Sequence, residues 1–216
     1  MLETFNEILI EDLLIAEEDN KTINEVKYNY NSTLKEDLHE LNMLNLIHEG
    51  VKEFYTKIGD GFKLKWRKNK NGSIDGNIQL ATTKSLFADP KSFDFYDNET
   101  NENADINFFH PFDYSSAESY VGFIIKPDFV YKSLYYMSIS DYQLNNLDLD
   151  FHGYTEMAVE ARVFNHWQVV LLYYMGDIET GLSETETFKT EMPKIFPDWT
   201  WENFIAKFES LRLSTK

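Results

Sequence analysis

The chain has 216 residues, no cysteine and a formal net charge of −17 at pH 7. The lack of cysteine excludes disulfides, thiol catalysis and Cys-ligated metal sites. The acidic balance argues against a nucleic-acid partner, because phosphate contacts need a basic surface. An apolar content of 43% with 17 Phe and 13 Tyr predicts one well-packed domain spanning residues 1–216.

No signal peptide is recognisable, because acidic residues interrupt the apolar N-terminus every few positions. The sequence also lacks a run of about 18 apolar residues, the length that a membrane span requires. We therefore expect a cytoplasmic protein with no membrane partner.

The N-terminal region predicts two helices separated by a polar loop. Residues 2–18 form an amphipathic pattern whose apolar positions are Leu2, Phe5, Leu9, Leu13 and Ala16. Residues 19–31 are polar and are expected to form a loop. Thr33 and Glu36 have the spacing of a capping box, which predicts the start of a second helix.

The stretch FYTKIGDGFKLKW, residues 54–66, joins a helix to a strand through glycines. The helical stripe comprises Val51, Phe54, Tyr55 and Ile58. Gly59 is placed where a left-handed residue ends a helix. Alternation over residues 62–67 then predicts a half-buried strand with basic residues outside, and we expect these to protect a sheet edge: Lys63, Lys65 and Arg67.

Asn71-Gly72 is a hairpin-turn signal, and residues 74–80 alternate as a second strand antiparallel to the first. An exposed loop is predicted at 88–105, followed by strands at 121–125 and 129–139. A helix is predicted from about Asp148, and residues 167–174 form a buried helix or strand. The last predicted element is a C-terminal helix with Thr200 or Asp198 as its N-cap. Pro193 and Pro197 are expected to bound a stiff linker.

This order predicts an α+β fold: N-terminal helices, an antiparallel β-sheet, and C-terminal helices packed on the sheet. Three segments carry a family resemblance: residues 54–66, SIDGNIQL at 73–80, and NLDLDFHGYTEMAVEARVFNHWQ at 146–168. Their key positions are Trp66, Ile74, Gly76 and Ile78, and HPFDYS at 110–115 adds a Pro-Phe-Asp strand end. On these residues the chain resembles the SUKH superfamily of Smi/Knr-type regulators and bacterial immunity proteins, best over residues 34–175.

The resemblance implies a non-enzymatic binding module without cofactor, catalytic residues or metal. Bacterial SUKH members are mostly immunity proteins that neutralise a protein toxin, often a nuclease. A regulatory scaffold that binds an endogenous protein is the alternative, since Smi/Knr regulators share the resemblance. The N-terminal helix and the segment after residue 176 lie outside the matched region.

Acidic residues concentrate in the second half of the chain. Residues 92–161 hold thirteen Asp or Glu but only two Lys. Such a region is either a solvated face or a patch that attracts a basic toxin. Aromatic residues among the acids would be the anchors, so the candidate partner-binding residues are Tyr131, Tyr135, Tyr136, Asp141, Tyr142, Asp148 and Asp150.

Two patterns allow a second alternative, an uncharacterised hydrolase. Asp148, Asp150 and His152 offer oxygen and nitrogen ligands for a metal. A helix beginning here would turn these positions apart, and Asp is also common at helix N-termini. His110 and Asp113 could form an acid–base pair, but no catalytic motif accompanies them.

Overall fold

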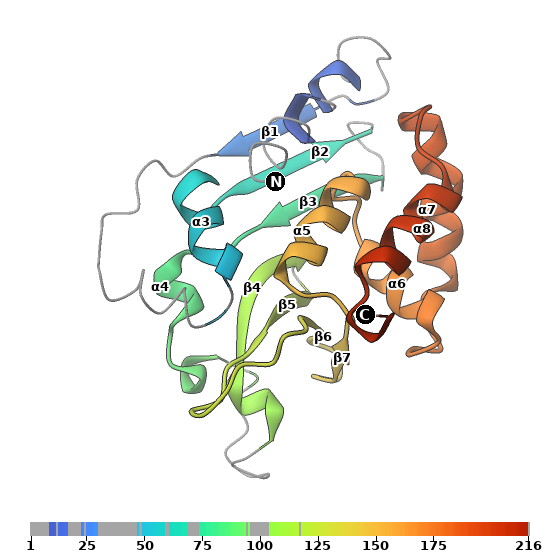
Figure 1. Cartoon of the computed structure of the whole chain (residues 1–216). Helices are drawn as coiled ribbons and strands as arrows, with labels where there is room; N and C mark the ends of the chain where they lie inside the picture. Colours follow the sequence, from blue (N-terminus) through green and yellow to red (C-terminus); the bar gives the residue numbers. More distant parts are fainter. Residues whose placement is uncertain are drawn as a thin grey trace.

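The chain folds into two antiparallel β-sheets covered by helices, an α+β architecture with the C-terminal helices after the sheets (Figure 1). The computed structural model describes residues 9–11, 13–16, 23, 25–29, 47, 49–58, 61–68, 74–93, 95, 104–116 and 118–215. The predicted second helix after Thr33, Gly59 and the Asn71-Gly72 turn lie outside these residues.

Among the described residues, seven strands form the two sheets, ordered β1-β2-β3 and β4-β5-β6-β7. Their bounds are β1 Glu25–Asn29, β2 Lys63–Arg67, β3 Asp75–Gln79, β4 Phe109–Ser116, β5 Ser119–Ile124, β6 Tyr135–Ser138 and β7 Leu144–Asn146. The sheets meet where Leu80 bridges to Asp113 and the Ala81 amide donates to the Phe112 carbonyl at 2.7 Å. The strands thus form one antiparallel series interrupted at the β3–β4 junction.

The helices lie mainly after the sheets in the chain. They are α3 Glu49–Ile58, α4 Thr83–Leu86, α5 Phe151–Glu160, α6 Trp167–Met175, α7 Leu182–Ile195 and α8 Trp201–Leu211, with short 3₁₀ segments at Pro90–Ser92, Asp105–Phe108 and Leu213–Thr215. Residues 9–11 and 13–16 are also helical. No helix within the described ranges is both long enough and apolar enough to cross a membrane.

The β2–β3 hairpin follows the predicted alternation. Leu64 and Trp66 are buried, whereas Lys63 and Lys65 are exposed. In the antiparallel register Trp66 lies opposite Gly76. Because apolar side chains occupy one face only, a slip of one residue would expose the tryptophan, which fixes the register.

The prediction of a loop over residues 19–31 was wrong for β1, which pairs antiparallel with β2. Val26 and Tyr28 alternate with polar residues, but the strand is too short and too polar to stand out. Its presence makes β2 the central strand of its sheet. The basic side chains of β2 therefore do not protect a sheet edge, as the sequence had suggested.

Other predicted boundaries need correction. The strand expected over 129–139 is only β6, because residues 129–134 form no strand beyond the single bridge of Val130 to Ile125. Pro193 is not in a linker but inside α7. The proline removes one backbone hydrogen bond of α7, and the helix ends two residues later at Ile195. The segment 167–174 is helical, and Thr200 is the N-cap of α8, accepting from the Asn203 amide at 3.2 Å.

A single hydrophobic cluster extends from the N-terminal helical residues through both sheets to α8. The ring of Phe112 on β4 packs edge-to-face on Phe151 and Tyr154 of α5, which fixes that helix on the sheet. A second, smaller cluster contains Phe109 and Phe95 and is bordered by partly buried aromatic side chains. This second cluster lies next to the cavity described below.

Candidate functional site

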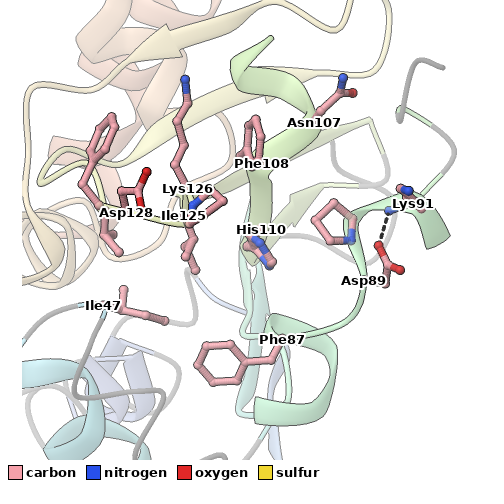
Figure 2. A pocket seen from close by; sticks show the side chains of 14 residues that line it. Ile47, Phe87, Asp89, Lys91, Asn107, Phe108, His110, Ile125, Lys126 and Asp128 are labelled. Carbon is pink, nitrogen blue, oxygen red and sulfur yellow. Dashed lines mark hydrogen bonds between the residues drawn. The ribbon is translucent and has the colours of Figure 1, made fainter. Parts of the chain in front are cut away.

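A cavity of about 590 Å³ opens beside the start of β4 (Figure 2). Its walls come from Ile47, the loop after α4, the 3₁₀ turn leading into β4, the start of β4, and the chain that leaves β5. The lining residues are Ile47, Phe87, Asp89, Pro90, Lys91, Asn107, Phe108, His110, Ile125, Lys126, Pro127, Asp128, Phe129 and Val130. A volume of this size matches ordinary ligand pockets. We call it the Phe129 pocket.

Lys126 stands among three aromatic rings on one wall of the pocket. Its Nζ lies 5.4 Å from the ring centre of Phe108 and 5.9 Å from those of Phe129 and Tyr131. The same ammonium is 2.6 Å from Asp105 Oδ1, and this hydrogen bond raises the pKa of Lys126. The Lys126 ammonium therefore stays protonated, and its positive charge is balanced by Asp105. It stabilises the surrounding aromatic rings more than it offers a binding site for an anion.

Phe129 is 51% exposed although it is an apolar side chain at the pocket rim. Its ring lies 5.0 Å from that of Tyr131, whose ring is in turn 5.9 Å from that of Tyr135. These three residues form a row, which we call the aromatic row. Tyr131 and Tyr135 are partly buried, so the exposed end of the row is Phe129. An exposed ring beside a cavity is the kind of surface that binds another molecule.

His110 lies on β4 between Phe108 and Phe87 (Figure 2). Its Nδ1 is 2.8 Å from the carbonyl oxygen of Leu86. Because a carbonyl only accepts hydrogen bonds, Nδ1 carries the proton. Burial lowers the pKa of His110 more than the Leu86 hydrogen bond and the nearby Asp89 raise it. The ring is therefore neutral at pH 7, and Nε2 is an acceptor.

The predicted partner-binding residues do not form one patch. Tyr131 and Tyr135 belong to the aromatic row. Tyr136, the next residue on β6, faces the opposite side of the sheet and is only 9% exposed, within the main core. Asp141 and Tyr142 lie in the turn between β6 and β7, where Tyr142 has a positive φ of 55° and is 44% exposed.

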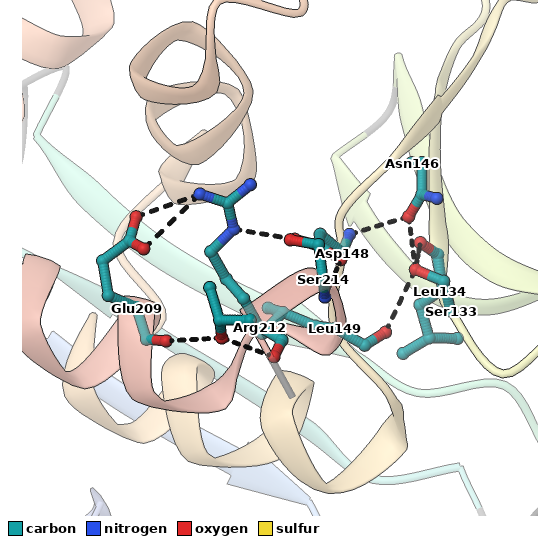
Figure 3. Close-up of polar contacts among 9 residues, drawn as sticks. Ser133, Leu134, Asn146, Asp148, Leu149, Glu209, Arg212 and Ser214 are labelled. Atoms are coloured by element: carbon teal, nitrogen blue, oxygen red, sulfur yellow. Dashed lines mark hydrogen bonds and ion pairs between the residues drawn. The ribbon is translucent and has the colours of Figure 1, made fainter.

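Asp148 and Asp150 hold the chain in place instead of facing a free surface. Asp148 accepts hydrogen bonds from Arg212 Nε at 2.7 Å, from the Ser214 amide at 3.0 Å and from the Ser214 hydroxyl (Figure 3). Burial alone would raise the pKa of Asp148, but the bonds from Ser214 and Arg212 outweigh it and lower the pKa. Asp150 caps α5 by accepting from the Gly153 amide at 2.8 Å.

The three residues of the hypothetical metal site therefore have separate roles. Asp148 forms an ion pair, Asp150 caps α5, and His152 lies within that helix. Within the described part of the chain, no three His, Asp or Glu side chains are grouped so that they could hold a metal. His110 and Asp113 also take different partners, Leu86 for the histidine and Tyr154 for the aspartate.

Asp113 belongs to a buried polar network at the junction of the sheets. Its Oδ2 accepts from the Tyr154 hydroxyl at 2.6 Å, and Tyr154 accepts from Gln168 Nε2 at 2.9 Å. Its Oδ1 accepts from the Gln79 amide at 3.0 Å. Burial raises the pKa of Asp113 to about 7, although the hydrogen bonds from Tyr154 and Gln79 oppose this. The carboxyl group of Asp113 on β4 thus connects to β3 through Gln79 and to α5 through Tyr154. We therefore assign this network a structural role.

Sequence reasoning did not identify Phe129 and Lys126 as site residues, and it considered His110 only as an acid–base partner of Asp113. The sequence feature that could have indicated the site is the polar turn Lys126-Pro127-Asp128. It is followed directly by the apolar ring of Phe129 and an aromatic-rich run. None of the known protein families, curated proteins or solved structures matches the chain.

Proposed function

We propose that the chain is a non-enzymatic protein-binding module, an immunity protein of the SUKH type that neutralises a basic toxin domain by occupying its surface. The observation that carries this proposal is the exposed ring of Phe129 at the rim of a cavity of about 590 Å³. The α+β order of elements supports the SUKH resemblance, and so does the Trp66–Gly76 pairing of the residues that carry it.

An exposed ring beside a cavity suits a binding hot spot. Fully burying a Phe side chain contributes on the order of 2 kcal/mol, so covering the exposed half of Phe129 contributes on the order of 1 kcal/mol. The Phe129 ring is already held by Tyr131 and by the Lys126 ammonium. Little side-chain entropy is therefore lost when a partner covers it, which increases the net gain.

Charge supplies the second support. The chain carries a formal net charge of −17. Asp89 and Asp128, at the rim of the Phe129 pocket, are both exposed. A basic toxin domain would be attracted to such a protein, and its association would be faster than that of a neutral domain. The proposal places this encounter in the cytoplasm, where a delivered toxin would act.

The experiment is co-expression with the protein encoded immediately upstream, followed by affinity purification and a growth assay. Co-purification together with rescue of growth supports the immunity function and identifies the target. If the upstream protein neither binds nor is toxic, and a housekeeping protein is recovered instead, the alternative of a regulatory scaffold replaces the immunity function.

A further inference from the structure

We propose that the Phe129 pocket binds a tyrosine or tryptophan side chain of the protein partner, with His110 Nε2 accepting the hydrogen bond from its O–H or N–H group. This inference rests on the proposed protein-binding function and adds the chemistry of the anchor residue. It is carried by the shape of the cavity, the tautomer of His110 and the charges around the rim.

The cavity walls suit a flat aromatic group. Phe87 and Phe108 lie on either side of His110, and Ile125 and Ile47 lie across from them (Figure 2). The volume of about 590 Å³ exceeds what one side chain needs, so the anchor can enter with part of its own backbone. Flat rings gain most from such walls, because aromatic contacts add to simple burial.

His110 supplies the polar element. Its side chain is only 9% exposed, and Nδ1 is occupied by the Leu86 carbonyl at 2.8 Å. Among the described residues, no hydrogen bond to Nε2 is present. Nε2 is not one of the buried polar atoms that lack a partner in the described part of the chain. A ligand that covers Nε2 without a donor would bury this acceptor unsatisfied, so a ligand that carries a donor is favoured over one of the same shape without it.

The charges at the rim disfavour an anionic ligand. Lys126 is paired with Asp105 at 2.6 Å, and the exposed carboxylates of Asp89 and Asp128 outnumber the one other lysine that lines the pocket, Lys91. A carboxylate or phosphate would therefore meet net repulsion. A neutral phenol or indole flanked by basic residues avoids this repulsion, and Tyr and Trp side chains provide these groups.

The test uses the wild-type protein with three small probes: indole, p-cresol and 1-methylindole. In NMR titrations at pH 7.5, indole and p-cresol should shift the amide signals of pocket residues. Indole should bind roughly threefold to tenfold tighter than 1-methylindole, which has the same ring system without the donor. Equal affinities for indole and 1-methylindole, or no binding of any probe, would overturn the inference.

A variant provides the second measurement. His110→Phe keeps an aromatic ring but removes the acceptor, so the preference for indole over 1-methylindole should disappear. If the variant does not fold, the comparison of probes on the wild-type protein still decides. A folded His110→Phe protein that keeps the full preference would show that another group accepts the bond.

Competition with the captured partner connects the pocket to the function. Indole at saturating concentration should weaken capture of the partner, and 1-methylindole should do so less. If indole binds selectively and capture is unchanged, the partner does not use the pocket and the inference fails, while the proposed function stands. If no partner is captured under any condition, the proposed function fails, and the probe titrations still report on the pocket.

Discussion

The indole of Trp66 lies directly over Gly76 on the neighbouring strand, so close that a β-carbon at position 76 would stand 2.1 Å from Trp66 Nε1. The same indole nitrogen donates to the Arg162 carbonyl oxygen at 2.6 Å. The next carbonyl, that of Val163, accepts from the Asn77 amide at 2.8 Å. This pair therefore joins the first sheet to the connection between α5 and α6.

Replacing Gly76 by alanine should destabilise the protein by about 2 kcal/mol or more, because neither the buried indole nor the Val163 carbonyl can move aside easily. Urea unfolding measures the change. In a Trp66→Phe background the same substitution should cost less, since the smaller ring leaves room. Equal costs in both backgrounds would show that the indole is not the obstacle.

The Asp113 network predicts an unusual pH dependence of stability. The folded-state pKa of about 7 lies above the ordinary value of 3.8, so the folded protein binds the proton more tightly than the unfolded chain. The contribution of Asp113 is therefore complete below the ordinary value and is lost as pH rises towards 7, with a slope approaching about 1.4 kcal/mol per pH unit. His110, whose pKa is lowered, contributes the opposite slope below its ordinary value of 6.5.

Comparing wild type with Asp113→Asn isolates the aspartate, because His110 is present in both proteins. The amide can still accept from the Gln79 amide, so the fold should be kept. In urea unfolding between pH 5 and pH 8, the variant should gain stability relative to wild type as pH rises. A constant difference between the two proteins over this range would refute a raised pKa.

Asp148→Asn should destabilise the protein by roughly 1–2 kcal/mol, since the carboxylate holds Arg212 and Ser214 at the end of the chain. The effect should fade as pH falls below the ordinary carboxyl range, because the pKa of Asp148 is lowered and its contribution is lost on protonation. Asp177→Asn, at an exposed position, is the matched control and should change stability by less than about 0.5 kcal/mol.

Association with a basic partner should depend on salt. Exposed charges are screened beyond about 8 Å at physiological ionic strength. The association rate, measured by stopped-flow or surface plasmon resonance, should fall several-fold, on the order of 3 to 10 times, from low to physiological salt. If the dissociation rate changes little with salt, the salt effect acts on the encounter between the two proteins and not on the formed complex. An association rate independent of salt would remove charge steering from the mechanism.

Local patterns were predictable where side chains alternate between water and core. The β2–β3 hairpin has apolar residues on one face only, and Thr200 precedes an amphipathic helix, so the patterns of both elements appear in the sequence. β1 was missed because its stability comes from pairing with β2, about 40 residues away, and not from its own composition. Strand pairing at such a distance leaves no local mark.

The candidate site was less predictable, because burial and partners decide it. Asp148 and Asp141 look alike in the sequence, but only Asp148 meets Arg212 from the end of the chain. Tyr135 and Tyr136 are neighbours that face opposite sides of β6. The Phe129 pocket collects residues from positions 47 to 130, and only the folded chain brings them together.

The most direct test of the proposed function is the affinity of the captured partner for Phe129→Ala. Leu182→Ala is the control, because Leu182 is 57% exposed at the start of α7 and does not line the pocket. If Phe129 is the anchor surface, its replacement should weaken binding at least tenfold, on the hot-spot scale of about 2 kcal/mol. The control should bind as wild type does. Wild-type affinity for Phe129→Ala would contradict the assignment of this face to the partner.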